Sequence, residues 1–388
     1  MHSRTFGGRA LRTIAGVVLA VAPSTAFTGQ AHAGTTGPLH ARTAGPAHAG
    51  TTGPLHAGTT GPAHAGTTGP LHAGTTGPAR AGTHRTPVVT EFPVTPGSGA
   101  TFLAAGPGGA VWFTELTGDR IGRIRGDGTL TEFPIPTPDS APLDVTAGPD
   151  GAMWFTEFLG NKIGRITGDG GVTEVPIPTP GSRPEGIAAA RDGSLWFTEG
   201  AAGKIGRLTP AGEITEFPLP TEGGSPHAIT AGPDGAMWFT DPGGDRIGRI
   251  TLTGLITEFV LPTPRSGPHR IVTGPDHALW FTERAADRIG RITPSGRITE
   301  FRLPEGRQPL DITRGPGGDL WFTERAAGCV GRITPAGRIT RFAVPTPAAG
   351  PLGITAGAGR TIWFAEGTAD AIGRLRAPRH DKGSTGCP

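Results

Sequence analysis

Seven tryptophans recur at a nearly constant interval through most of this 388-residue chain. Successive tryptophans are 42, 42, 42, 42, 41 and 42 residues apart, at Trp112, Trp154, Trp196, Trp238, Trp280, Trp321 and Trp363. An internal period of 40 to 45 residues is typical of the four-stranded blade of a β-propeller. The spacing therefore predicts a ring of repeated blades.

Each repeat contains four short segments with strand character, separated by Gly- and Pro-containing turns. In one repeat they are PHAITAG, AMWFT, RIGRIT and ITEFVLP. The repeat region opens with an isolated fourth segment, Val88 to Val94, and ends with a third segment that lacks its fourth, Ala371 to Arg376. We expect the N-terminal strand to complete the last blade, because closure removes exposed sheet edges. The sequence predicts an all-β, seven-bladed propeller over residues 87–376.

The first strand of each repeat is small and apolar, which suits the crowded centre of the ring. The fourth carries Glu and Pro, which suits the solvent-facing edge. The residues that lead into the first strand should therefore open on the central channel.

The N-terminus has the features of an export signal. Arg4, Arg9 and Arg12 precede a short apolar stretch, and Ala31-His32-Ala33 is a candidate cleavage site. We expect a signal peptide over residues 1–33 and a secreted protein without stable membrane insertion, since the apolar stretch is short for a membrane span. An uncleaved membrane anchor is the alternative.

Residues 34–86 repeat GPLHAGTT and GPAHAGTT with a period of eight. Gly, Pro, Thr and Ala bury too little apolar surface to offset the entropy of ordering, so we expect a disordered linker. Its regular histidines could alternatively bind a metal weakly. Residues 377–388 should form a flexible tail, and a disulfide between Cys329 and Cys387 stays open.

The formal net charge is only +3, and no Lys/Arg run or basic helix stands out. Nucleic acid is therefore a poor candidate partner. A small ligand at the channel mouth and a monomeric state are the expectations.

Two columns of charged residues occur in every repeat. Three residues after each Trp stand Glu115, Glu157, Glu199, Asp241, Glu283, Glu324 and Glu366, and eleven residues after it stand Arg123, Arg165, Arg207, Arg249, Arg291, Arg332 and Arg374. A feature present in every blade favours a structural role, so we expect acid–arginine pairs between the second and third strands. Asp276 lies in a GPDx turn and suggests turn chemistry.

A third column differs between blades. Eleven residues before each Trp stand Thr101, Leu143, Glu185, His227, His269, Leu310 and Leu352. Adjacent blades thus place Glu185, His227 and His269 at one depth, where two imidazoles beside a carboxylate can transfer protons or hold a metal with Glu185 or Glu283. Alternatively, the histidines are ordinary hydrogen-bonded channel residues, because an apolar column follows two positions later.

The repeated unit, with GPDGAMWFTE, KIGRIT and ITEFPLPTP segments, resembles the virginiamycin B lyase (streptogramin lyase) family over the whole propeller. The resemblance implies opening of a cyclic depsipeptide by elimination at its ester, assisted by a divalent metal, usually Mg²⁺. A histidine would remove the proton alpha to a carbonyl, while a metal polarises that carbonyl.

Two alignments carry the family's site onto this chain. Aligned by motif, His227 and His269 are the catalytic pair, and His227 and Glu185 contact the substrate. Glu283 and Glu185 are the candidate metal ligands. Gly267 stands at the position where the family usually has a metal ligand. Aligned by ring closure, the family positions fall instead on Leu310, Leu352, Gly350, Glu366 and Thr101. The first hypothesis is therefore a secreted lyase acting through His227 and His269. The second is a non-catalytic propeller that binds a peptide, glycan or cell-wall component.

Overall fold

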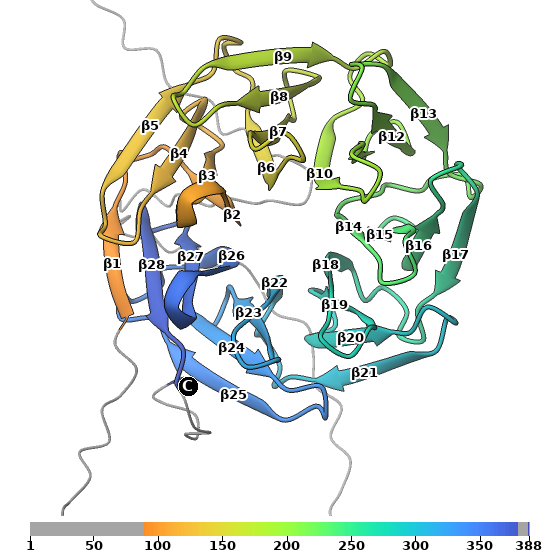
Figure 1. Cartoon of the computed structure of the whole chain (residues 1–388). Helices are drawn as coiled ribbons and strands as arrows, with labels where there is room; N and C mark the ends of the chain where they lie inside the picture. Colours follow the sequence, from red (N-terminus) through yellow and green to blue (C-terminus); the bar gives the residue numbers. More distant parts are fainter. Residues whose placement is uncertain (1–88, 379–386, 388) are drawn as a thin grey trace, which may run out of the picture. The chain divides into compact units, whose positions relative to one another are not determined.

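The computed structural model describes residues 89–378 and residue 387, which form seven four-stranded antiparallel sheets arranged as the blades of a propeller (Figure 1). This confirms the predicted fold class. The predicted signal peptide and octapeptide linker lie outside the described residues, as does most of the predicted tail.

Each blade is a meander in which consecutive strands pair. Blade 1 comprises β2 (Ala100–Ala105), β3 (Val111–Glu115), β4 (Arg120–Ile124) and β5 (Leu130–Pro134). Blade 2 comprises β6 (Pro142–Ala147), β7 (Met153–Glu157), β8 (Lys162–Ile166) and β9 (Val172–Pro176). Blade 3 comprises β10 (Pro184–Ala189), β11 (Leu195–Glu199), β12 (Lys204–Leu208) and β13 (Ile214–Pro218). Blades 4 and 5 comprise β14 (Ile229–Ala231), β15 (Met237–Asp241), β16 (Arg246–Ile250), β17 (Ile256–Val260); β18 (Pro268–Thr273), β19 (Leu279–Glu283), β20 (Arg288–Ile292), β21 (Ile298–Arg302). Blade 6 comprises β22 (Pro309–Arg314), β23 (Leu320–Glu324), β24 (Cys329–Ile333) and β25 (Ile339–Ala343). Short 3₁₀ turns occur at Pro107–Gly109 and Ala358–Arg360.

Blade 7 is closed by the N-terminal strand, as predicted. It contains β26 (Pro351–Gly357), β27 (Thr361–Glu366), β28 (Ala371–Arg376) and β1 (Val89–Pro93), in that order from the channel outward. Phe92 of β1 stacks on Trp363 with ring centroids 5.6 Å apart, which reproduces the Trp–Phe stack within blades 1 and 3 to 6. Glu91 accepts hydrogen bonds from Thr346, as Glu132 does from Thr95. The N-terminal strand thus supplies the contacts that any other fourth strand supplies.

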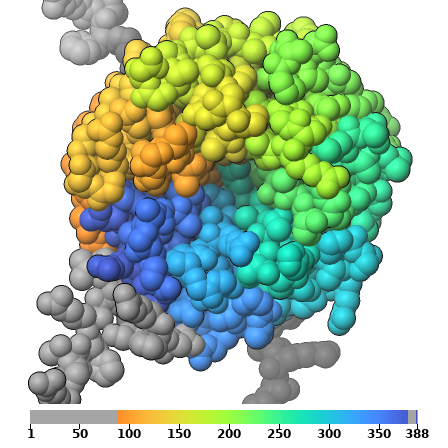
Figure 2. Space-filling model, in the orientation of Figure 1, coloured from red at the N-terminus to blue at the C-terminus, as the bar shows by residue number. Residues whose placement is uncertain are grey.

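The first strands line the centre of the ring and the fourth strands form its rim (Figure 1). The space-filling view shows a hollow at the centre of the face in view, where the first strands converge (Figure 2). The core lies between blades and is built from the Trp, Phe and Ile side chains of the second and third strands; Trp238, Phe239 and Ile247 are fully buried. Glycine is required on the third strand, because a Cβ at Gly206 would lie 2.1 Å from the Phe197 ring.

In six of the seven blades, a threonine of the second strand ties the first strand to the next blade. Thr282 accepts a hydrogen bond from the Arg270 amide at 3.0 Å and donates one to the Leu310 carbonyl of blade 6 at 2.9 Å. Equivalent bonds run from Thr114, Thr156, Thr198, Thr240 and Thr323. In blade 7 the position is Ala365. These bonds fix the backbone at a register shift between Pro268 and Ile271 in β18, the irregularity that carries the channel residues.

We predict that Thr282→Val lowers the free energy of unfolding by about 1–3 kcal/mol, because it leaves a buried amide and a buried carbonyl without that partner. Urea denaturation of the whole chain measures the loss. Thr282→Ser keeps the hydroxyl and should lose less. A Val variant as stable as the Ser variant would contradict the role of the hydroxyl.

The arginine column does not pair with the acid column, contrary to the sequence expectation. Arg249 instead binds Asp234 of the turn between the first two strands, at 2.6 Å, and Arg165 and Arg291 bind Asp150 and Asp276 likewise. The two columns lie at opposite ends of the pair of strands β15 and β16. Arg249 is opposite Trp238, at the end nearest the turn that contains Asp234, whereas Asp241 lies at the other end, opposite Arg246. Asp276 is thus a turn residue, as predicted, and also an anchor for Trp280.

A disulfide joins Cys329 at the start of β24 to Cys387, with Cα atoms 6.2 Å apart. The possible pairing left open by the sequence is therefore present. No helix in the part of the chain that the structure describes is long and apolar enough to cross a membrane.

Candidate functional site

The column that differs between blades lies at the channel. Glu185 is the second residue of β10, His227 lies two residues before the start of β14, and His269 is the second residue of β18. All three side chains are buried, with 5 to 7% of their residue surface exposed. The structure therefore places the three predicted residues on adjacent blades around one opening.

Each histidine is oriented by the backbone of the next blade. His227 Nδ1 lies 3.0 Å from the His269 carbonyl oxygen, and His269 Nδ1 lies 3.1 Å from that of Leu310. A carbonyl oxygen only accepts, so each Nδ1 carries the proton and each Nε2 presents a lone pair when the ring is neutral. The two rings pack against each other with centroids 4.0 Å apart.

The two Nε2 atoms differ in their surroundings. His227 Nε2 lies 3.1 Å from Glu185 Oε2. Burial raises the pKa of Glu185 to about 8, against the opposing effect of Arg270 and Arg183, and burial together with Arg270 lowers the pKa of His227 to about 3. At neutral pH a protonated Glu185 therefore donates to neutral His227. His269 Nε2 is buried and has no hydrogen-bond partner among the described residues.

Burial, with His227, Arg270 and Arg284 nearby, holds the pKa of His269 well below its usual value of 6.5. The ring is thus neutral at physiological pH and its Nε2 lone pair is available to accept a proton or to bind a ligand. A buried polar atom without a partner requires an explanation, and a catalytic role is one explanation that fits a neutral imidazole.

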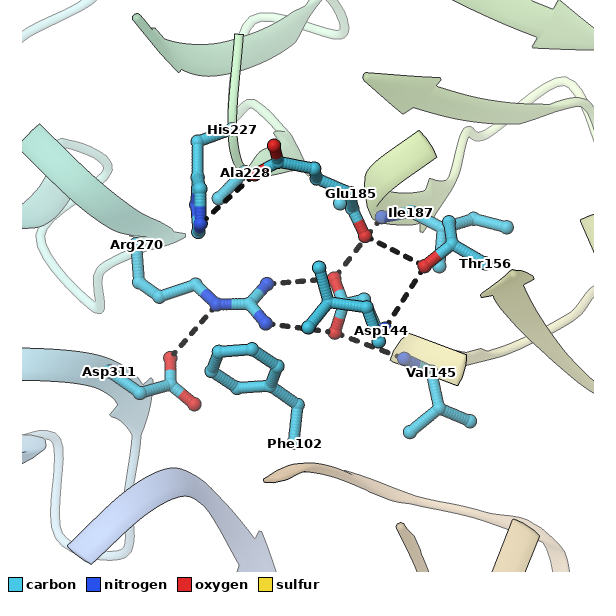
Figure 3. Close-up of polar contacts among 12 residues, drawn as sticks. Phe102, Asp144, Val145, Thr156, Glu185, Ile187, His227, Ala228, Arg270 and Asp311 are labelled. Atoms are coloured by element: carbon cyan, nitrogen blue, oxygen red, sulfur yellow. Dashed lines mark hydrogen bonds and ion pairs between the residues drawn. The ribbon is translucent and has the colours of Figure 1, made fainter. Parts of the chain in front are cut away.

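A charged network that we did not predict connects several blades beside the histidines. Arg270 lies at the centre of Figure 3, with both terminal nitrogens on the Asp144 carboxylate, at 2.7 and 3.2 Å. Its Nε is 3.9 Å from Asp311 Oδ1, and its guanidinium carbon is 3.5 Å from the Phe102 ring centroid. This one side chain therefore joins blades 1, 2, 5 and 6 across the channel.

The two aspartates extend the network into further blades. Asp144 accepts from the Ile187 amide of blade 3, and Asp311 accepts from the Ile354 amide of blade 7. Burial raises the pKa of Asp311 to about 6, although Arg270 and two amides oppose the shift. In the sequence, this network could have been found in the column one residue after the histidine column, where one arginine and two aspartates occur among uncharged residues. That column reads Phe102, Asp144, Gly186, Ala228, Arg270, Asp311 and Gly353.

Glu283 lies apart from this network. It ends β19 opposite Pro268 and is fully buried, and neither carboxylate oxygen has a hydrogen-bond partner in the part of the chain that the structure describes. Glu157, Glu199 and Glu366 share that condition. The orphaned carboxylate is therefore a property of the repeat and does not mark a metal ligand in blade 5.

The donor atoms do not fit a bound Mg²⁺. Within the described residues, Glu324, Cys329 and Cys387 are the one group of three possible ligands whose atoms all lie within 4.8 Å of one another, and its two sulfurs form the disulfide. Near the histidines, Glu185 is directed toward His227, and Gly267 offers no side chain. Mg²⁺ prefers an octahedron of oxygen atoms, whereas this opening presents imidazole nitrogens.

Three of the five positions given by ring closure have no polar side chain. Leu310 and Leu352 are buried in one cluster with Leu103 and Ala100, and Gly350 carries no ligand. Thr101 donates to the Gly99 carbonyl at 2.8 Å. Of this set, only Glu366 has a titratable side chain.

The buried acids give a prediction for stability. The pKa is raised to about 8 for Glu157, Glu283 and Glu366 and to about 7 for Glu199, chiefly by burial, from 4.5. A raised carboxyl pKa contributes stability below pH 4.5 that is lost as pH rises through the folded-state value. We expect the melting temperature to fall between about pH 5 and 8, because these four acids outnumber the two histidines, whose lowered pKa makes stability rise with pH only up to about 6.5.

Calorimetry across this pH range checks the slope. Glu157→Gln replaces one titrating group with a neutral one of the same shape, so its profile should be flatter than that of the unmodified protein. A melting temperature that rises steadily from pH 5 to pH 8 would contradict the assignment.

The sequence model of the family described as "Virginiamycin B lyase family" matches residues 65–274 and 229–380. The structure is similar to a selenomethionine-substituted virginiamycin B lyase from Staphylococcus aureus, with 44% identity and a TM-score of 0.73 over 75% of this chain and 100% of the other. A catalytically inactive variant of the Staphylococcus aureus enzyme, solved with quinupristin, is 43% identical over the same shares, with a TM-score of 0.72.

A curated relative, the virginiamycin B lyase of Bordetella parapertussis, is 44% identical over 52 residues. That alignment spans 13% of this chain and 17% of the relative. The similarity to the Staphylococcus aureus structures, by contrast, extends over the full propeller.

Proposed function

The chain belongs to the virginiamycin B lyase family, and from this premise we propose that it linearises a cyclic depsipeptide by elimination at its ester. The observation that carries the proposal is His269: a neutral, buried imidazole at the channel with its Nδ1 fixed and its Nε2 unpartnered. The proposed substrate class is a type B streptogramin, since quinupristin was solved with a related enzyme.

In the proposed reaction, His269 Nε2 takes the proton alpha to the carbonyl of the ester-linked residue. The electrons of that C–H bond form a carbon–carbon double bond, the ester C–O bond breaks, and the carboxylate leaves with its electron pair. The Leu310 carbonyl accepts from Nδ1–H and thereby stabilises the imidazolium that forms.

The surrounding charges favour the negative charge that develops. Arg270 and Arg284 lie close enough to His269 to lower its pKa, so their positive potential also reaches the reacting atoms. His227 and Glu185 contribute a hydrogen-bonded pair that is net neutral at pH 7 and holds the His227 ring against His269. We propose these two residues as the substrate-contacting side of the site.

The experiment is to incubate the purified protein with quinupristin and Mg²⁺ and to weigh the product. Elimination gives a linear product of unchanged mass, detected by its altered chromatographic retention and fragmentation. A product heavier by one water would establish hydrolysis instead, and an intact ring at high protein concentration would overturn the proposal.

A second candidate function is supported by the burial of the site. His269 Nε2 is buried, so a substrate must displace neighbouring side chains to reach it. The possible ligand atoms around it also do not fit Mg²⁺. These observations favour a non-catalytic propeller that binds a peptide or glycan at this mouth. Saturable binding of quinupristin without any product would support this alternative.

We further propose that the protein acts outside the cell. The disulfide between Cys329 and Cys387 is consistent with an oxidising compartment. Detection of the chain in culture medium, starting after Ala33, would support export, whereas recovery only from the cytosol with reduced cysteines would contradict it.

A further inference from the structure

In three blades, one aspartate joins the repeat's tryptophan to its arginine. Asp234 Oδ1 accepts from Trp238 Nε1 at 3.0 Å and from the Ala236 amide at 3.3 Å, and Oδ2 accepts from Arg249 Nε at 2.6 Å. Asp150 and Asp276 make the same two contacts in blades 2 and 5, at 3.0 Å from the indole nitrogen and 2.6 to 2.7 Å from the arginine. The blade therefore contains a built position for one carboxylate.

Blade 1 has both donors but lacks the carboxylate. The equivalent of Asp234 is Gly108, in the turn GPGG. Trp112 Nε1 and Arg123 Nε are both buried and have no hydrogen-bond partner among the described residues. The Trp112 residue as a whole is only 2% exposed. Leaving such donors unpaired is costly, so the site favours a ligand that accepts from both.

A cavity occupies the place of the missing side chain. It has a volume of about 150 Å³ and is lined by Gly108, Trp112, Arg123, Arg125, Met153 and neighbouring residues. Arg123 donates from Nη1 to the Gly168 carbonyl, and within the described residues no carboxylate pairs with it, so its positive charge lies beside the cavity. Burial and the nearby charge of Arg125 lower its pKa. A cavity of about this size holds a small organic molecule.

We propose that this cavity is a carboxylate-binding site, in which an external carboxylate accepts from Trp112 Nε1 and Arg123 Nε. The contacts would repeat those of Asp234 in blade 4. The site is separate from the histidine opening: the turn at 107–109 joins β2 to β3 at Ala105 and Val111, whereas the channel residue Thr101 lies near the opposite end of that hairpin. The inference does not depend on the proposed lyase activity.

Blade 6 is the internal contrast. Trp321 Nε1 also has no hydrogen-bond partner within residues 89–378 and 387, but Asp319 is 2.7 Å from Arg332 Nε and supplies a negative charge. A second carboxylate would be repelled there. We therefore expect selectivity for blade 1, although both blades carry a GPGG turn.

The ligand carboxylate could belong to a small acid, to a peptide C-terminus or to an acidic side chain. Titration of the whole chain with sodium acetate, Gly-Gly-Gly, Gly-Gly-Gly amide and N-acetyl-aspartate amide distinguishes these sources. The readout is the indole N–H region of the ¹H–¹⁵N spectrum, with Trp112 assigned from Trp112→Phe. We expect a saturable shift of the Trp112 signal with acids, none with the amide of Gly-Gly-Gly, and none with sodium chloride at equal ionic strength.

Two matched variants test the assignment. Gly108→Asp restores the GPDG sequence of residues 148–151 and 232–235, at a backbone position with a φ of 68° that aspartate tolerates better than most residues other than glycine. It should weaken acetate binding by ~10-fold or more, because the position is then filled by its own carboxylate. Asp150→Gly should create a second response at Trp154. A Trp112 signal that moves no more than that of Trp238, or that still responds in Gly108→Asp, would overturn the proposal.

Discussion

Arg270→Met is expected to lower the free energy of unfolding by about 3–5 kcal/mol, among the largest stability losses that a single substitution can cause here. Methionine fills much of the same volume but leaves Asp144 and Asp311 buried in the channel without their shared cation. The loss arises from uncompensated charge, since the side chain's contact with Phe102 is largely replaceable by another apolar group.

The pH dependence separates this cause from a simple packing defect. Arg270 lowers the pKa of Asp311, so its removal should raise that pKa above its present value of about 6. A carboxyl pKa raised above 3.8 contributes stability below that pH and loses it as pH rises through the folded-state value. The deficit of Arg270→Met should therefore shrink at pH 5 and be largest at pH 8.

Urea denaturation at both pH values measures this difference. Arg270→Lys is the matched control, because it keeps the charge and loses the paired contact with Asp144; we expect an intermediate loss. Adding Asp144→Asn to Arg270→Met should recover part of the stability. A deficit that is independent of pH would contradict the electrostatic account.

The second large effect is catalytic. His269→Ala should lower kcat/KM for streptogramin ring opening by ~10³-fold or more, since a positioned general base contributes about 10²–10⁴-fold. The unmodified protein should show no loss of activity between pH 7 and pH 6, because the pKa of His269 lies well below 6.5. A fall in rate with an apparent pKa near 6.5 would point to a different base.

Two controls accompany the His269 variant. Leu352→Ala changes a family site position given by ring closure and should lower kcat/KM by less than ~10-fold, as an apolar side chain transfers no proton. Glu185→Gln keeps a hydrogen bond to His227 and should have a smaller effect than His269→Ala. If the Leu352 variant lost more activity than the His269 variant, the site would have to be moved to blade 7.

The fold could be predicted from the sequence because the repeat supplied seven copies of one pattern. The isolated strand at Val89–Pro93 and the incomplete last blade predicted the closure that Phe92 and Trp363 make. The central position of the first strands followed from their small apolar residues. The pairing of charged columns was wrong, because spacing alone does not tell which end of a strand carries each partner.

The site was only partly predictable. Glu185, His227 and His269 differed from their column and lie together, but Arg270 was overlooked because it joins positions 126 residues apart and no local pattern encodes that contact. The disulfide likewise connects residues 58 apart. The empty carboxylate position in blade 1 was visible as GPGG in place of GPDG, yet its meaning required the geometry of Trp112 and Arg123.

The most direct test of the account is the position of quinupristin on the His269→Ala variant, determined by crystallography of the complex. We predict that the ester of the ligand lies over the opening between blades 3 and 5, in contact with His227 and Glu185. A ligand bound over Leu310 and Leu352, or at another face of the ring, would contradict it.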